Sequence, residues 1–216
     1  MRIRPVAGGE RAPASRAVYS CARTVLAPPA PSPPRATADV RLRPMQSVLI
    51  SACLLGQSVR YDGRDKRCDH DVVQRWLREG RVVPVCPEVA GGLSVPRPPA
   101  EIAHGAGGAQ VLAGLAKVVD VDRRDVTAQF VQGAEHAREL ARAQGIRVAV
   151  LKEGSPSCGT GFVHDGTFTG AKVPGLGVAA ALLAQAGVQV FSEARIDEAD
   201  ALLRRLEAEE EARRRA

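Results

Sequence analysis

The sequence contains few aromatic residues, few histidines and no long apolar run. Phe, Trp and Tyr make up 3% of the 216 residues, so aliphatic side chains must fill the core. No run approaches the roughly 20 apolar residues that a membrane-spanning helix needs. The longest apolar run near the N-terminus, residues 24–27, is too short for the apolar part of a secretory signal. We therefore expect a cytoplasmic protein without a membrane span.

Cysteine is present, but not in the arrangements that make disulfide frameworks or compact zinc sites. The chain has five cysteines, an odd number, and none of them forms a Cys-x-x-Cys pair. An odd count without an export signal argues against a disulfide framework and favours free or metal-bound thiolates. Two of the five are set aside: Cys21 because it lies in an irregular N-terminal stretch, and Cys68 because it lies in a polar loop.

The positive charge is confined to the N-terminus. A net charge of +6 and a pI near 9.4 would ordinarily suggest nucleic acid as a partner. Residues 1–44 hold eight arginines against Glu10 and Asp39, which accounts for the whole excess and leaves the remainder formally neutral. This distribution argues against a nucleic-acid partner for the body of the protein.

Residues 1–44 also hold eight of the 15 prolines and show no apolar periodicity, so we interpret them as a disordered arm. Met45 is the only methionine after Met1 and directly precedes the first strand-like run. Three interpretations stay open: translation begins at Met45, the arm is a real basic tail, or the arm is a transit peptide, although it lacks a clear amphipathic face. The sequence thus divides into the arm, an α/β domain over 45–195, and a C-terminal amphipathic helix over 196–216.

From Met45 onward, strand and helix patterns alternate. We expect strands at 47–52, 82–86, 117–121, 147–152 and 188–192, and helices near 69–79, 125–144, 176–187 and 197–214. Asp125 is the expected N-cap of the second helix. Strands joined by helices predict a single three-layer α/β domain with a mainly parallel sheet.

Three cysteines follow three of these strands: Cys53, Cys86 and Cys158. Taken alone, each would be interpreted as a small buried apolar residue. Because ligands gather beyond the carboxyl ends of parallel strands, we expect the three thiols to meet in one crevice. Three thiols suggest a soft metal site, and three ligands rather than four leave one coordination position open, as in catalytic metal centres.

The ligand pattern favours an iron–sulfur cluster over zinc. Structural zinc sites usually include a close ligand pair, whereas these cysteines are far apart in sequence, and no histidine lies within a cysteine segment. Soft thiolates select iron–sulfur clusters, and three thiolates would leave one iron exchangeable.

Polar residues accompany the second and third cysteines. Glu88, two residues after Cys86, is a general acid or base for a bound substrate, or else an ordinary helix-terminal charge or part of a surface ion pair. Arg97 either clamps an anionic or carbonyl group or is solvated. The loop that carries Cys158 also offers the hydroxyls of Ser155 and Ser157.

Several motifs occur in one order between about residues 47 and 193. They are Ser-Ala-Cys-Leu-Leu-Gly (51–56), Arg-Tyr-Asp-Gly (60–63), Val-Cys-Pro-Glu (85–88), Gly-Gly-Leu (91–93), Pro-Arg-Pro-Pro-Ala-Glu (96–101), Leu-Lys-Glu-Gly-Ser-Pro-Ser-Cys-Gly (151–159), Gly-Leu-Gly-Val (175–178) and Val-Phe-Ser-Glu (190–193). Through these motifs the chain resembles the TudS-like thiouracil desulfidases.

The resemblance implies a cluster of four irons and four sulfides held by Cys53, Cys86 and Cys158, whose fourth iron binds the sulfur of a small thiolated substrate such as thiouracil. It also implies that Glu88 and a serine are catalytic, with Ser155 favoured by its position and Ser157 as the second choice. The reaction would release sulfide without net redox change. The alternative is a non-catalytic cluster- or metal-binding module for sulfur transfer or redox sensing.

Overall fold

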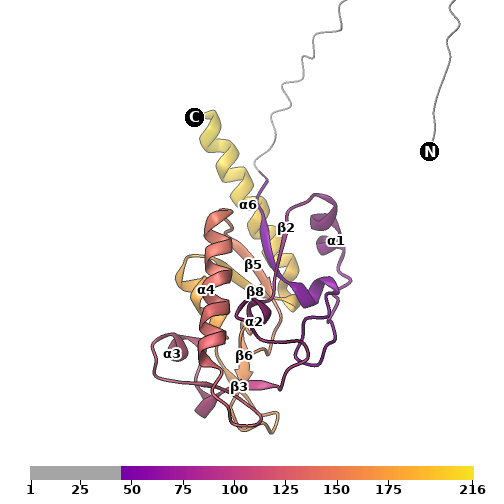
Figure 1. Cartoon of the computed structure of the whole chain (residues 1–216). Coiled ribbons are helices and arrows are strands. Elements are labelled where there is room, and N and C mark those ends of the chain that lie inside the picture. Colours follow the sequence, from indigo (N-terminus) through magenta and orange to yellow (C-terminus); the bar gives the residue numbers. More distant parts are fainter. Residues whose placement is uncertain (1–44) are drawn as a thin grey trace, which may run out of the picture. The chain divides into compact units, whose positions relative to one another are not determined.

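The computed structural model describes residues 45–216 (Figure 1). The interpretation of residues 1–44 as a disordered arm lies outside this part of the chain.

A four-stranded parallel sheet forms the centre of the domain. Its strands are β1 (Val48–Ser51), β2 (Val82–Val85), β5 (Val148–Leu151) and β8 (Gln189–Ser192), in the order β2-β1-β5-β8. The two central strands, β1 and β5, are short aliphatic runs buried at every position, as expected for strands covered on both faces. Pro84 fits in β2 because β2 is an edge strand, where a missing N–H need not break the ladder. The expected parallel α/β sheet is confirmed.

Helices cover both faces of this sheet, which gives the expected three layers (Figure 1). The side chains of β1 alternate between the faces: Val48 and Ile50 point to one core and Leu49 to the other. The first core is closed by α1 (Asp71–Arg78) and α6 (Ile196–Arg215). The second is closed by α4 (Thr127–Ala143) and α5 (Val178–Gln185).

Two antiparallel strand pairs lie outside the main sheet. β3 (Ala100–Ile102) pairs with β4 (Val118–Asp120), and β6 (Phe162–His164) pairs with β7 (Lys172–Pro174). The strand expected at 117–121 is therefore real, but it pairs with β3 and not with the parallel strands. A third apolar cluster, which includes Ile102, Val118, Phe130 and Val163, packs these pairs against α4 and α5.

Short helical segments complete the fold. They are η1 (Ala52–Leu55), α2 (Pro87–Ala90), η2 (Ala103–Gly105), α3 (Gly108–Leu112) and η3 (Glu193–Arg195). The expectation that Asp125 caps the next helix is wrong by one position, because Val126 is the N-cap of α4. The Asp125 backbone forms a bridge with Val119, and its carboxylate accepts a hydrogen bond from the Thr127 N–H. The pairing with β4 keeps Asp125 out of the helix.

The packing of α6 against α1 is fixed by a buried carboxylate. Asp200, 7% exposed, accepts hydrogen bonds from Trp76 Nε1 at 3.1 Å and Arg204 Nε at 2.9 Å, and it also pairs with Arg75. Burial alone would raise the pKa of Asp200, but the hydrogen bonds from Arg75 and Trp76, together with the positive charges of Arg75 and Arg204, hold the pKa below its usual value. This contact joins the two helices on one face of the sheet.

The sheet topology places a binding crevice at the end of β1. The chain leaves β1 to form β2 on one side and later returns to form β5 on the other. Such a reversal of strand order opens a crevice beyond the carboxyl ends of the strands. Within residues 45–216, no helix is both long and apolar enough to cross a membrane.

Candidate functional site

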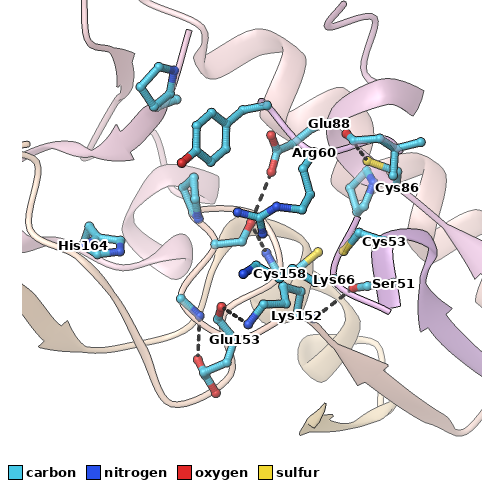
Figure 2. A pocket seen from close by; sticks show the side chains of 18 of the residues that line it. Ser51, Cys53, Arg60, Lys66, Cys86, Glu88, Lys152, Glu153, Cys158 and His164 are labelled. Atoms are coloured by element: carbon cyan, nitrogen blue, oxygen red, sulfur yellow. Dashed lines mark hydrogen bonds between the residues drawn. The ribbon is translucent and has the colours of Figure 1, made fainter. Parts of the chain in front are cut away.

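A cavity of about 550 Å³ lies at this edge of the sheet (Figure 2). Its walls come from the segments that follow β1, β2 and β5, with further contributions from β3, β6 and β7. Cys53, Cys86 and Cys158 all line it, as do Glu88 and Ser155. The structure therefore brings together five of the six site residues predicted from the sequence, and the sixth, Ser157, does not line the cavity.

Each cysteine is placed by the end of a different strand. Cys53 lies in η1 directly after β1, and Cys86 directly follows β2. Cys158 lies in the loop that leaves β5. Because β2, β1 and β5 are parallel neighbours, their carboxyl ends bring the three thiols to one place. Figure 2 shows the three cysteines gathered at one side of the cavity, with His164 on the other side of the view.

The thiols are held in a setting that disfavours ionisation unless a cation binds. Burial raises the pKa of Cys53 to about 11; the nearby Cys86 adds to this rise, and the positive charges of Arg60 and Lys152 oppose it. Burial also raises the pKa of Cys86.

Cys158 is the most deeply buried of the three. Burial raises the pKa of its thiol strongly, and a hydrogen bond from the Ser51 side chain acts against the rise. The charges of Cys53 and Cys86 also affect Cys158, so the three thiols are electrostatically coupled. Metal binding would have to displace their protons.

The three thiols share a cavity without converging on one point. Among residues 45–216, no three His, Cys, Asp or Glu side chains are close enough to hold a single metal ion. Cys53, Cys68, Cys86 and Cys158 are all free thiols. Cys68, which the sequence set aside, packs against an apolar cluster and does not line the cavity.

A hydrogen-bonded chain of side chains stands beside the thiols. The Ser155 hydroxyl donates to Glu88 Oε1 at 3.2 Å and accepts from the backbone N–H groups of Ser157 and Cys158 at 3.1 and 3.2 Å. The other carboxylate oxygen of Glu88, Oε2, accepts from Arg97 Nε at 2.9 Å and Nη2 at 2.7 Å. Ser155 thus links the Cys158 loop to the carboxylate that follows Cys86.

Ser157, the second choice of serine, lies apart from this chain. It is 0% exposed and does not line the cavity. Its Oγ has no hydrogen-bond partner among the residues that the structure describes. Of the two serines, the structure therefore brings only Ser155 to Glu88.

The neighbouring Lys152 and Glu153 have structural partners. Lys152 Nζ pairs with Glu193. Glu153 organises its own loop by accepting hydrogen bonds from Thr160 Oγ1 at 2.7 Å and the Phe162 N–H at 3.2 Å. The sequence did not identify Glu193 as the partner of Lys152. Glu193 directly follows β8 in the Val-Phe-Ser-Glu motif, however, just as the cysteines follow their strands, and this position was the available signal.

Comparisons with known proteins agree on one family. The family model described as 2-thiouracil desulfurase matches residues 48–195. The uncharacterized protein YbbK of Bacillus subtilis (strain 168) is 44% identical over 146 residues, which cover 68% of this chain and 95% of YbbK. A solved structure of a [4Fe-4S]-dependent thiouracil desulfidase, TudS, is 47% identical with a TM-score of 0.67, and the match covers 73% of this chain and 97% of that one. The chain belongs to the 2-thiouracil desulfurase family.

Proposed function

We propose that this protein is a [4Fe-4S]-dependent desulfidase that removes sulfur from a small thiocarbonyl compound, such as thiouracil, and releases it as sulfide. The observation that carries the proposal is the single cavity lined by three thiols, Glu88 and Ser155. Support comes from the 47% identity to a structure described as a [4Fe-4S]-dependent thiouracil desulfidase.

The donor set fits such a cluster. Cys53, Cys86 and Cys158 would hold it, since cysteine thiolates are the usual ligands of iron–sulfur clusters. All three thiols line one cavity, as the ligands of one shared group must. When bound, the cluster would supply Lewis-acid chemistry that polarises the C=S bond of the substrate.

The protein side chains would manage the water and the protons. Glu88 acts as the general base: Oε1 takes a proton from a water molecule while the water oxygen forms a bond to the thiocarbonyl carbon. The C–S bond then breaks, and sulfur leaves with the bonding electron pair as sulfide. Protonation gives hydrogen sulfide, so one water is consumed and no atom changes its net oxidation state.

Ser155 would direct this proton transfer. Its hydroxyl accepts two backbone N–H bonds, and such polarisation makes its own O–H a stronger donor to Glu88 Oε1. In this way Ser155 keeps Oε1 turned toward the cavity. A reducing compartment such as the cytoplasm, which the sequence suggests, would keep the three thiols available for the cluster.

The test is sulfide release by protein reconstituted with iron and sulfide in the absence of oxygen. The visible absorption spectrum and the iron and sulfide content report the cluster, and 2- and 4-thiouracil serve as substrates. We expect Glu88→Gln to lower kcat by about 100-fold or more while the iron content stays unchanged. Glu135→Gln, on the outer face of α4, serves as the matched control and keeps full activity.

The alternative, a non-catalytic module for sulfur transfer or redox sensing, predicts a different result. Protein that holds a full cluster but releases no sulfide from either thiouracil, or from related thioamides, would overturn the proposed desulfidase.

A further inference from the structure

Arg97 is buried between Glu88 and two neighbouring loops. Its side chain is 5% exposed, and Nε and Nη2 both donate to Glu88 Oε2. Nη2 also donates to the Val59 carbonyl and Nη1 to the Ser94 carbonyl, each at 3.0 Å. We infer that Arg97 is a positioning residue of the proposed desulfidase reaction, which holds Glu88 so that Oε1 faces Ser155 and the cavity; the inference rests on that proposed function.

Packing fixes the backbone beneath Glu88 but leaves its side chain dependent on polar contacts. α2 lies so close to α4 that a Cβ added at Gly133 would stand 1.9 Å from the Pro87 carbonyl oxygen. The Glu88 side chain, in contrast, lies between two spaces. It lines the cysteine cavity on one side, and on the other it lines a second cavity of about 300 Å³, together with Arg97 and Phe130.

A carboxylate with open space on two sides can rotate unless its oxygens are held. Arg97 uses two nitrogens on the same oxygen, Oε2. Oε1 receives a hydrogen bond from Ser155. Because a carboxylate oxygen can accept about two hydrogen bonds, Oε1 keeps one free position for a water molecule in the cavity. Arg97 thus occupies Oε2 and leaves Oε1 available to Ser155 and to water.

Arg97 also ties this carboxylate to the wall of the cavity. The Val59 carbonyl accepts from Arg97 and from the Cys86 thiol, whose Sγ lies 3.8 Å away. The Arg97 backbone N–H donates to the Tyr61 carbonyl, and Val59, Arg60 and Tyr61 all line the cavity. A lysine cannot replace these contacts, because one ammonium group lacks the planar fork.

The test compares Arg97→Gln and Arg97→Lys with wild type, using anaerobically reconstituted protein and 2-thiouracil. We expect Arg97→Gln to lower kcat by about 100-fold, as a displaced catalytic group does, with little change in KM and an unchanged iron content. Arg97→Lys should recover only a small part of the loss. The control is Arg124→Gln: Arg124 lines the second cavity and pairs with Asp120 and Asp122, not with Glu88, so kcat should stay at the wild-type value.

A double-mutant cycle separates positioning from a general effect on folding. If Arg97 acts through Glu88, then Arg97→Gln added to Glu88→Gln costs no further activity; losses that multiply would overturn the inference. If Arg97→Gln folds poorly, sulfide release by Arg97→Ala is measured with and without added guanidinium. Failure of guanidinium to restore any activity would count against Arg97 as a positioning residue. Wild-type kcat in Arg97→Gln would overturn this inference alone, whereas wild-type protein that releases no sulfide overturns the proposed function as well.

Discussion

Replacing Ser155 and Ser157 separately by alanine should change stability in opposite directions. The Ser157 hydroxyl is fully buried and has no hydrogen-bond partner among the residues that the structure describes. Burying a hydroxyl without a partner costs about 1–3 kcal/mol in protein mutational data. Part of the gain on its removal is offset by lost packing of one oxygen atom. We therefore expect Ser157→Ala to raise the free energy of unfolding by about 1 kcal/mol and to keep full activity.

Ser155→Ala should do the reverse. The backbone N–H groups of Ser157 and Cys158 both lose their acceptor, and a buried donor left without a partner costs about 1–3 kcal/mol. Water that enters from the cavity can satisfy one of them, so we expect a loss of about 2 kcal/mol. Glu88 Oε1 also loses its donor, and sulfide release should fall by about 100-fold or more.

The assay measures urea unfolding and sulfide release for the two variants and for wild type, all without oxygen and with the iron content determined. Activity lost in Ser157→Ala and kept in Ser155→Ala would refute the reasoning and transfer the role to Ser157. A Ser157→Ala protein that is less stable than wild type by more than 1 kcal/mol would show that the hydroxyl has a partner that the geometry does not reveal.

Three further results are expected. Serine in place of any one of Cys53, Cys86 or Cys158 should remove most of the bound iron, whereas Cys68→Ser should keep it; equal iron in all four variants would contradict the ligand assignment. Asp200→Ala leaves Arg75 and the Trp76 N–H without their carboxylate and should lower the free energy of unfolding by about 3 kcal/mol, measured in urea at pH 7. The pKa of Asp200 lies below its ordinary value of 3.8, so the Asp200 carboxylate stabilises the fold above pH 3.8 and stops doing so as the pH falls further. The difference in stability between wild type and Asp200→Ala should therefore shrink on acidification. A constant difference down to the lowest pH would contradict the sign of the shift.

The central sheet and its cysteines could be predicted from the sequence because both follow from local pattern. β5 is entirely aliphatic and β1 is aliphatic up to its last residue, Ser51, and the structure places both strands within one residue of the expected bounds. Strands of one sheet that are joined by helical crossovers run parallel. Their carboxyl ends must then share an edge, so Cys53, Cys86 and Cys158 line one cavity.

The parts that escaped prediction depend on contacts between distant segments. β3, β6 and β7 have three residues each, too few for a periodic pattern, and they exist because a neighbour completes their hydrogen bonds. The same holds for Arg97, which the sequence left as either a clamp or a solvated residue; its partner proved to be Glu88. The preference for Ser155 over Ser157 likewise rests on burial and hydrogen bonding, which two serines separated by one proline do not show in a sequence.

The distribution of the cysteines over three strands has a consequence for how a cluster would be acquired. Ligands in a Cys-x-x-Cys motif are neighbours even in an unfolded chain, whereas these thiols meet only when β2, β1 and β5 are paired. Burial then raises the pKa values of all three thiols, which favours their protonated form. The positive charges of Arg60 and Lys152 favour ionisation of Cys53, and that of Arg97 favours ionisation of Cys86. None of these three residues lies in a strand of the main sheet. On the proposed ligand assignment, cluster binding would therefore release protons from thiols that the paired strands already hold in one cavity.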